Sequence, residues 1–180
     1  GLLVSRSEEM KQRVDHLKNF GFVDETTVIE PGMNGKMSEF NAMVGVHQLK
    51  YMPEVLAARG VRDQLYRRRL DAVAGIQCQN PIRQHQRNYA YFPIFVQDDF
   101  PLSRDALYEH LKVHGIFGRR YFYPLISEFP MYAELASSDV RGLPVALAAS
   151  RQVICLPLYP DLALTEIENI CDLIAGAASG

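Results

Sequence analysis

The sequence predicts an α/β fold in which a largely helical first part precedes a small layer of alternating strands and helices. Two observations carry this prediction. Amphipathic helical patterns fill most of the first seventy residues, and afterwards β-branched and aromatic segments alternate with short capped helices. With 180 residues, of which 48% are hydrophobic, the chain can bury one compact core, or one core and part of a second.

A first helix is expected after Ser7, which can act as its N-cap. Two glutamates occupy the first turn, where negative charge is favourable, and Gly21 suits the end of a helix. Before this helix, residues 1–4 predict a short buried strand; because a natural chain start is usually more polar, we expect this chain to be a piece of a longer one. The apolar face of the helix should consist of Met10, Val14 and Leu17.

A long connection over residues 22–37 separates this helix from the next. It shows no hydrophobic period, and connections of such length are often functional. Ser38 should cap the second helix. The apolar positions of that helix include Phe40, Met43, Val44 and Leu49.

Pro53 predicts the first turn of a third helix, which runs to about Ala74 and is weakened at Gly60. The basic cluster Arg67–Arg69 lies on its polar side and is interpreted as a solvated face, with phosphate binding as the less favoured alternative. The buried stripe should contain Leu56, Val61, Leu65, Leu70 and Val73.

Three strands are expected in the second part. Residues 89–96 (YAYFPIFV) are rich in aromatic and β-branched residues, and Pro93 within them predicts an edge strand. Residues 116–122 (IFGRRYF) predict another strand, and residues 152–159 (QVICLPLY) a buried one.

Three short helices complete the second part. Ser103 should cap one that Gly115 closes, and residues 143–150 predict another after an irregular stretch. The last helix opens with Thr165 and Glu168 at capping-box spacing. Its buried positions should be Ile167, Ile170, Cys171 and Ile174.

Composition excludes several classes of function. A net charge of −2 gives no overall attraction to nucleic acid or to an anionic membrane, so a nucleic-acid module is the remotest alternative. No apolar run could span a bilayer and no signal-peptide pattern is present, which predicts a cytoplasmic protein. The three cysteines lack metal-site spacing, and His110 and His114, four residues apart, have no third ligand at a recognisable spacing, so no metal site is expected.

Residues 31–40, PGMNGKMSEF, contain the parts of an anion site. Glycines expose backbone N–H groups, the Asn34 amide can donate two hydrogen bonds, Lys36 brings charge, and a helix begins after Ser38. From spacing alone, a capped helix after a flexible loop is the favoured interpretation, because the P-loop pattern is absent.

Residues 118–125, GRRYFYPL, form the second candidate. Two arginines beside two tyrosines could hold a phosphate and stack on a base, whereas a strand end with exposed arginines is favoured from the residues alone. No GxSxG, HExxH or Rossmann glycine pattern occurs. The residues by themselves therefore predict no catalytic constellation.

Residues 32–59 change this interpretation, because they fit the pattern G-x-N-x-[KR]-[ML]-[ST/N]-E-x-x-A-x-x-G-x-x-QL. Together with residues 1–21, 119–132 and 143–170, they resemble the DegT/DnrJ/EryC1/StrS sugar aminotransferases, which are fold-type-I enzymes dependent on pyridoxal 5'-phosphate (PLP). The resemblance covers essentially the whole chain. It implies that residues 1–72 end the large PLP-binding domain and include a connecting helix, and that residues 73–180 form a small C-terminal α/β domain with a short, mainly antiparallel sheet.

The resemblance also assigns roles to residues. In the family, the lysine of the internal aldimine precedes the segment matched by residue 1, so this chain should carry no catalytic residue and be inactive alone. The cofactor-binding candidates are Asn34, which would contact the PLP phosphate of the other subunit of a homodimer, and Lys36. The candidates for the nucleotide-sugar pocket are Arg119, Arg120 and Tyr121. A histidine that often follows Pro-Leu in the family is replaced by Ile126-Ser127.

The resemblance thus implies the C-terminal half of an aminotransferase that moves an amino group, with glutamate as the amino-acid donor, to a nucleoside-diphosphate-linked keto-sugar. One alternative is a PLP-dependent sugar dehydratase of the same family, in which a histidine replaces the lysine. The other is a non-catalytic relative that only dimerises or binds ligand.

Overall fold

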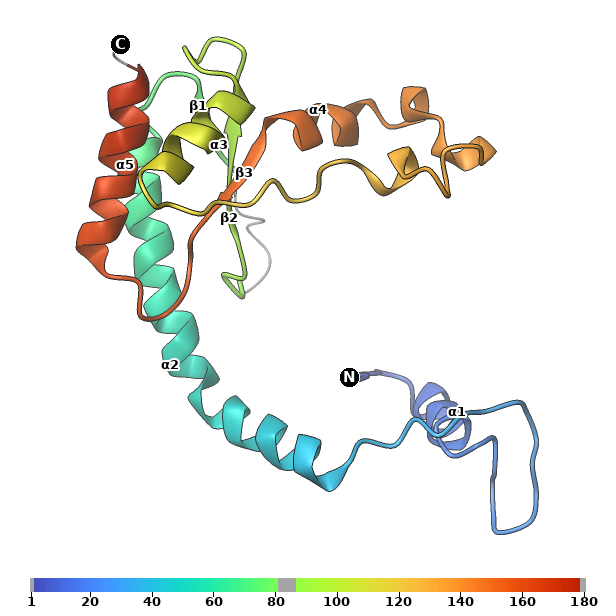
Figure 1. Cartoon of the computed structure of the whole chain (residues 1–180). Helices are drawn as coiled ribbons and strands as arrows, with labels where there is room; N and C mark the ends of the chain where they lie inside the picture. The colour runs from blue at the N-terminus through green and yellow to red at the C-terminus, as the bar shows by residue number, and fades with distance from the viewer. Residues whose placement is uncertain (1, 81–86, 179–180) are drawn as a thin grey trace. The chain divides into compact units, whose positions relative to one another are not determined.

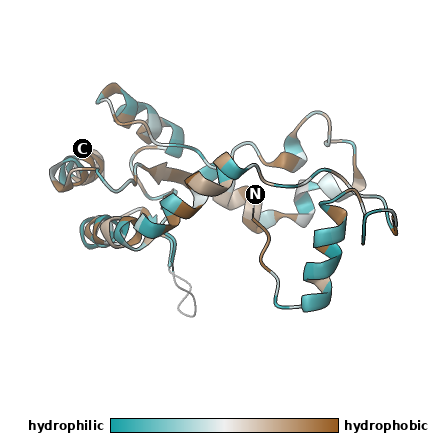
Figure 2. Cartoon of the chain, turned by 90° about the horizontal axis from the view of Figure 1, so that it is seen from below, coloured by the Kyte–Doolittle hydropathy of each residue, from teal (hydrophilic) through white to brown (hydrophobic). Residues whose placement is uncertain are grey.

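The computed structural model describes residues 2–80 and 87–178 (Figure 1). The chain divides into two compact units, residues 1–52 and residues 53–180. The domain boundary at residues 72 and 73, which concerns a longer parent fold, stays a prediction. Hydrophilic residues interrupt the hydrophobic ones along the helices (Figure 2), and none of the helices in the described ranges combines the length and apolar character needed to cross a membrane.

Helix α1, Glu8–Leu17, begins as predicted, because the Ser7 hydroxyl accepts a hydrogen bond from the N–H of Met10 at 3.2 Å. Gly21 follows the helix with a φ of +85°, and its N–H donates to the His16 carbonyl at 2.8 Å. No residue of α1 is buried. The helix therefore has its predicted apolar face, but the described part of the chain does not bury that face completely.

The predicted buried strand at the start of the chain is wrong. Leu2, Leu3 and Val4 have no regular structure and are 78%, 79% and 88% exposed. A strand needs a neighbour that takes up its backbone hydrogen bonds, and none of the described segments pairs with these residues. Their apolar character alone was misleading.

Helix α2, Glu39–Leu70, contains residues of both units. Its start was predicted correctly, since the Ser38 hydroxyl accepts from the N–H of Asn41 at 3.3 Å. The predicted new helix at Pro53 is wrong, because α2 runs through this residue. A proline removes one N–H from the ladder, and its fixed φ is compatible with a helix, so a 32-residue helix can accommodate it at a local cost. The predicted apolar residues of the first half are exposed: Phe40, Met43, Val44 and Leu49.

The second unit is built on a three-stranded antiparallel sheet of order β1-β2-β3. Ile94 of the central strand lies opposite Cys78 on one side and Ile154 on the other. Alternate residues of β2 are buried and half-buried, so the sheet has an inner and an outer face. The strands are β1, Ile76–Cys78, β2, Phe92–Val96, and β3, Val153–Leu156.

The helices of the second unit lie on both sides of this sheet (Figure 1). The C-terminal part of α2, α3 (Arg104–Val113) and α5 (Leu164–Ala178) enclose the core with the inner face of the sheet, whereas α4 (Pro144–Gln152) neighbours β2. Three short 3₁₀ segments precede α4, namely Ile126–Glu128, Ala136–Ser138 and Val140–Gly142. The core includes Tyr66, Leu70, Phe92, Ile94, Leu107, Leu111, Ile154, Ile167, Ile170 and Ile174.

Two predictions about the sheet need correction. Pro93 lies in the central strand, not at an edge. The adjacent strand β1 ends at Cys78, which pairs with Ile94. Pro93 therefore has no partner in β1, and its missing N–H removes no hydrogen bond to that strand. Residues 116–122 do not form a strand but a single bridge between Arg119 and Cys155, after which the chain leaves the sheet.

The helices of the second unit mostly confirm the expectations. The Ser103 hydroxyl caps α3 by accepting from the N–H of Ala106 at 3.2 Å, and Gly115 follows α3 with a φ of +78°. The capping box at Thr165 does not form, because α5 begins one residue earlier and the Ala163 carbonyl accepts the first N–H groups. The four positions predicted to be buried in α5 are buried.

Candidate functional site

The loop that contains Asn34 is fastened to the end of α1. The N–H of Met33 donates to the Leu17 carbonyl and the N–H of Gly35 to the Lys18 carbonyl, both at 2.8 Å. A Cβ at Gly32 would lie 2.3 Å from the backbone nitrogen of Gly21, so only glycine fits there. These glycines and N–H groups therefore hold the loop, whereas the sequence had suggested them as anion donors.

Asn34 and Lys36 differ in how the fold uses them. The Asn34 side chain is exposed, and its amide has no hydrogen-bond partner among residues 2–80 and 87–178. The Lys36 ammonium donates to the Asn19 side-chain oxygen at 2.9 Å and lies 5.2 Å from the centre of the Phe20 ring. Asn34 thus keeps free donors, while Lys36 is partly engaged.

A hollow of about 700 Å³ lies beside this loop. Its lining comes from residues 35–37 of the loop, from α1 and its C-cap Lys18, and from residues 2, 3 and 5. Lys11 and Lys18 contribute two further ammonium groups, and hydrogen bonds from Lys11 and then Lys18 lower the pKa of Asp15 to about 2. Three ammonium groups and one carboxylate leave two net positive charges in the lining. The sequence interpretation missed Lys11 and Lys18, although their spacing of seven residues around Asp15 places them on one helix face.

The three residues predicted for the nucleotide-sugar pocket have separate roles. Arg119 pairs with Cys155 through two backbone hydrogen bonds of 2.9 and 2.7 Å, and its exposed guanidinium lies 5.6 Å from the centre of the Tyr121 ring. Arg120 donates to Asp105 of α3 at 2.7 Å, which lowers the pKa of that carboxyl, and stacks over Tyr108 at 4.4 Å. Arg120 therefore holds the segment on α3, and Arg119 keeps an available charge.

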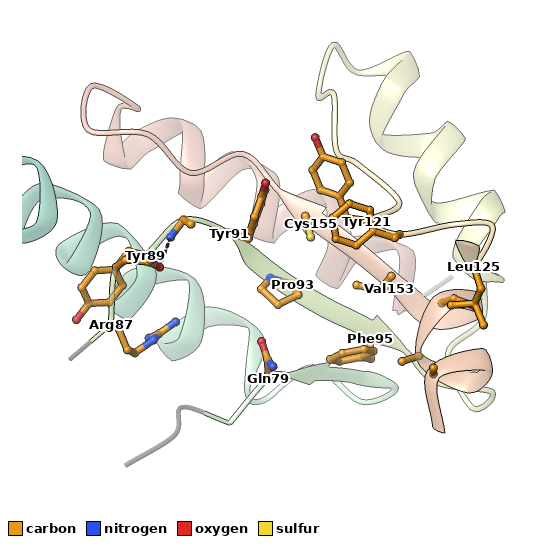
Figure 3. A pocket seen from close by; sticks show the side chains of 16 residues that line it. Gln79, Arg87, Tyr89, Tyr91, Pro93, Phe95, Tyr121, Leu125, Val153 and Cys155 are labelled. Carbon is orange, nitrogen blue, oxygen red and sulfur yellow. Dashed lines mark hydrogen bonds between the residues drawn. The ribbon is translucent and has the colours of Figure 1, made fainter. Parts of the chain in front are cut away.

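Tyr121 lines a cleft of about 520 Å³ on the outer face of the sheet (Figure 3). Pro93 and Phe95 of β2 lie beside Val153 and Cys155 of β3 as its floor. Further lining residues come from the segment before β2, from the segment after Arg120 and from α4. A second hollow, of about 590 Å³, contains Arg119 and Arg120 and shares Tyr121 and Phe122 with the first.

A buried ion cluster, which the sequence interpretation missed, supports one end of the cleft. Asp63 of α2 is only 1% exposed and accepts hydrogen bonds from Arg67 at 2.9 Å and from Arg87 at 2.8 Å. Arg87 also lines the cleft. The interpretation of Arg67–Arg69 as a solvated face fits Arg68 but is wrong for Arg67, which is half-buried because Asp63 draws it inward.

The paired histidines and the three cysteines lie in surroundings that indicate structural rather than catalytic roles. His110 and His114 lie with ring centres 4.7 Å apart, and in the described part of the chain no group of three metal-ligating side chains occurs. All three cysteines are buried, and burial raises the pKa of Cys78 and Cys171 to about 12 and that of Cys155 to about 11. We therefore expect these thiols to be neutral and unreactive at neutral pH.

Comparison with curated proteins gives close relatives. The chain is 45% identical over 176 residues to dTDP-4-amino-4,6-dideoxy-D-glucose transaminase of Escherichia coli, a match that covers 98% of this chain and 47% of the relative. The chain thus spans about half the length of the curated relatives it matches.

Solved structures show the same fold. DesI, solved in the presence of its TDP-sugar product, is 25% identical with a TM-score of 0.81, over 98% of this chain and 44% of DesI. The putative sugar aminotransferase Spr1654 from Streptococcus pneumoniae, in its PLP form, is 20% identical with a TM-score of 0.82, over 99% of this chain and 46% of that protein. The described structure is therefore part of a fold-type-I enzyme fold.

The family resemblance is confirmed over nearly the full length of the chain. The sequence profile of the DegT/DnrJ/EryC1/StrS aminotransferase family matches residues 1–175. The chain belongs to the DegT/DnrJ/EryC1/StrS aminotransferase family.

Proposed function

We propose that this chain is the C-terminal half of a PLP-dependent nucleotide-sugar aminotransferase that moves an amino group from glutamate to a nucleoside-diphosphate-linked keto-sugar. The observation that carries the proposal is the 45% identity, over 98% of this chain, to the E. coli dTDP-4-amino-4,6-dideoxy-D-glucose transaminase. Its two candidate regions, the loop at Asn34 and the cleft at Tyr121, have the chemistry that such an enzyme needs for a phosphate and for a nucleotide.

The surroundings of Asn34 fit the phosphate of PLP. The free amide of Asn34 offers two donors, and the adjacent hollow carries two net positive charges from its lysines and Asp15. PLP, when bound, supplies the electron sink for the chemistry at the amino-bearing carbon. We infer that Asn34 binds the phosphate of a cofactor held mainly by the partner subunit, and that Lys36 contributes charge nearby.

The surroundings of Tyr121 fit the nucleotide end of the substrate. Arg119 presents a guanidinium over an aromatic ring, which suits a phosphate next to a planar base. Arg120 acts indirectly, since its ion pair with Asp105 holds the segment on α3. Among the three predicted residues we therefore assign substrate contact to Arg119 and Tyr121, and support to Arg120.

The test uses the full-length protein loaded with PLP. Incubation with glutamate and a dTDP-linked 4-keto-sugar should yield the amino-sugar nucleotide and 2-oxoglutarate in equal amounts. Release of a dehydrated sugar without 2-oxoglutarate would instead indicate the dehydratase, and failure to bind PLP would indicate a non-catalytic relative; either result contradicts the proposal.

The role of Asn34 is tested by PLP affinity in the same protein. Loss of a hydrogen bond to a charged phosphate is worth about 1.5–3 kcal/mol, so Asn34→Ala should raise the Kd for PLP about 10- to 100-fold. Asn169→Ala is the matched control, because Asn169 lies on α5 beside a different hollow. An unchanged Kd for PLP in Asn34→Ala would show that Asn34 does not bind the cofactor phosphate.

A further inference from the structure

Tyr91 stands out on the rim of the cleft because it is a large aromatic side chain that the fold leaves 53% exposed. It lies just before β2 and meets Tyr121 edge to face, with ring centres 5.2 Å apart and planes at 71°. Figure 3 shows the two rings side by side at the same rim. Two rings that meet at a steep angle form a corner, in which a flat group can stack on one ring and contact the edge of the other.

A cation adjoins this corner. The Arg119 guanidinium lies 5.6 Å from the centre of the Tyr121 ring, and in residues 2–80 and 87–178 no carboxylate pairs with it. Its neighbour Arg120 is by contrast occupied by Asp105. An aromatic corner with an unpaired guanidinium beside it is the chemistry that recognises a planar base joined to a phosphate.

The segment that carries Tyr91 is anchored rather than loose. Tyr89, two residues earlier, has a φ of +48°, a conformation that only a well-held non-glycine residue keeps. Its ring rests on Gly60 of α2, where an added Cβ would lie 3.4 Å from the ring, and the Arg87 guanidinium lies 4.8 Å from the ring centre. Arg87 is held in turn by the buried Asp63, so the anchor extends into the core.

We propose that Tyr91 is a specificity-determining residue, which together with Tyr121 stacks on the base of the nucleotide part of the substrate while Arg119 binds its phosphates. Arg87 is a positioning residue, because it acts through Tyr89 on the direction of Tyr91. The proposal rests on the proposed function for the identity of the ligand.

The test measures binding of dTDP and of inorganic pyrophosphate to the full-length enzyme by calorimetry. Base–aromatic stacking predicts that Tyr91→Leu raises the Kd for dTDP about tenfold and leaves the Kd for pyrophosphate unchanged, whereas Tyr91→Phe keeps both within about twofold. Arg119→Ala should weaken both ligands. Tyr159→Leu is the control, since Tyr159 is 46% exposed beside another hollow and should bind like the wild type.

Positioning by Arg87 predicts a split in kinetic constants that a general loss of stability would not produce. Arg87→Ala should raise the KM for the nucleotide-sugar and leave the KM for glutamate unchanged, and Arg87→Lys should restore part of the loss. Equal rises in both KM values would show that Arg87 has a merely structural role and overturn the positioning part of the proposal.

Two outcomes would overturn the role of Tyr91. One is a Tyr91→Leu enzyme that binds dTDP like the wild type; the other is a Tyr91→Phe enzyme that loses as much affinity as Tyr91→Leu, which would assign the effect to the hydroxyl. Because binding is measured without turnover, an enzyme that fails to transaminate but shows the predicted affinities would contradict the proposed function alone.

Discussion

Helices α1 and α5 show how differently the two units use the same sequence pattern. Both were predicted from apolar residues at helical spacing, yet α5 buries four residues and α1 buries none. In residues 53–180 the sheet, α2 and α3 lie ready to cover α5. Periodicity therefore predicts which face of a helix is apolar, whereas the residues that bury that face have to come from elsewhere in the structure.

The contrast extends over the whole of the first unit. Large apolar side chains stay exposed there, and the chain spans about half the length of its relatives, so we expect their cover to come from polypeptide outside the described residues. Residues 53–180 should hold their fold through their own core. The most exposed apolar residues of the first unit are Leu2, Leu3, Val4, Met33, Phe40, Met43, Val46 and Leu49.

The largest expected effect is on the core of the second unit. Phe92 is fully buried against Tyr66, with ring centres 4.7 Å apart, so Phe92→Ala should lower the free energy of unfolding by about 3–5 kcal/mol. In the chain of residues 1–180, Phe40→Ala is the matched control, because Phe40 is 70% exposed there and its loss should leave that free energy unchanged. Urea unfolding followed by circular dichroism measures both free energies. Equal losses would contradict the claim that residues 53–180 hold their fold through their own core.

The next effect concerns the buried ion cluster. Asp63→Ala leaves Arg67 and Arg87 without their carboxylate, which should cost about 3 kcal/mol of unfolding free energy. Asp139→Ala removes the exposed partner of Arg141 and should have no measurable effect in the same urea titration. A stable Asp63→Ala protein would show that the cluster does not hold the wall of the cleft.

Helix caps give a smaller effect that separates the units. Ser103 and Ser7 make equivalent hydrogen bonds of 3.2 Å to a backbone N–H. Ser103→Ala should destabilise the second unit by about 1 kcal/mol. Ser7→Ala should leave the main unfolding transition in place, because α1 buries none of its residues. Thermal unfolding measures the melting temperature of both variants. Equal decreases in melting temperature would contradict the expected difference between the two units.

The smallest effect is that of pH on the buried thiols. Burial raises the pKa of Cys78 from its ordinary value of 9.0 to about 12, so the thiol is neutral at pH 8 and should react with iodoacetamide only after unfolding. Since the unfolded chain ionises first, the contribution to stability is present below pH 9 and declines above it. A thiol introduced by Ser5→Cys, at an exposed position, should react at once. Rapid labelling of Cys78 in the folded protein would contradict a buried, neutral thiol.

Local signals made much of the fold predictable. Ser7, Ser38 and Ser103 cap helices where expected, because a cap depends only on residues three positions away. The predictions from Pro53 and Pro93 were wrong, since a proline is tolerated or not according to the backbone hydrogen bonds of the helix or sheet around it. That hydrogen-bond pattern depends on segments that are distant in the sequence, so it cannot be derived from one stretch alone.

The candidate site was predictable only in part, for the same reason. Asn34 and Tyr121 were already candidates from the local residues, and the family resemblance assigned their roles, which stay predictions. Tyr91 and Arg87 were not predicted, because their partners lie 30 and 24 residues away along the chain. Three-dimensional contact between Tyr91 and Tyr121 is what turns two ordinary tyrosines into a candidate binding surface.

We propose that Asn34, in a unit that covers little of its own apolar surface, binds the phosphate of a cofactor held by the other subunit. A mixture of two inactive full-length proteins tests whether Asn34 acts across the dimer. One carries Asn34→Ala and is assayed at a PLP concentration that leaves it empty; in the other, the lysine that the family resemblance places before residue 1 is replaced by Ala.

In a mixed dimer, one of the two sites then combines an intact lysine with an intact Asn34 from the partner. Random mixing in equal amounts should restore about a quarter of the wild-type activity, since half of the dimers are mixed and each has one complete site. Activity no greater than the sum of the two separate variants would contradict the claim that Asn34 acts across the dimer.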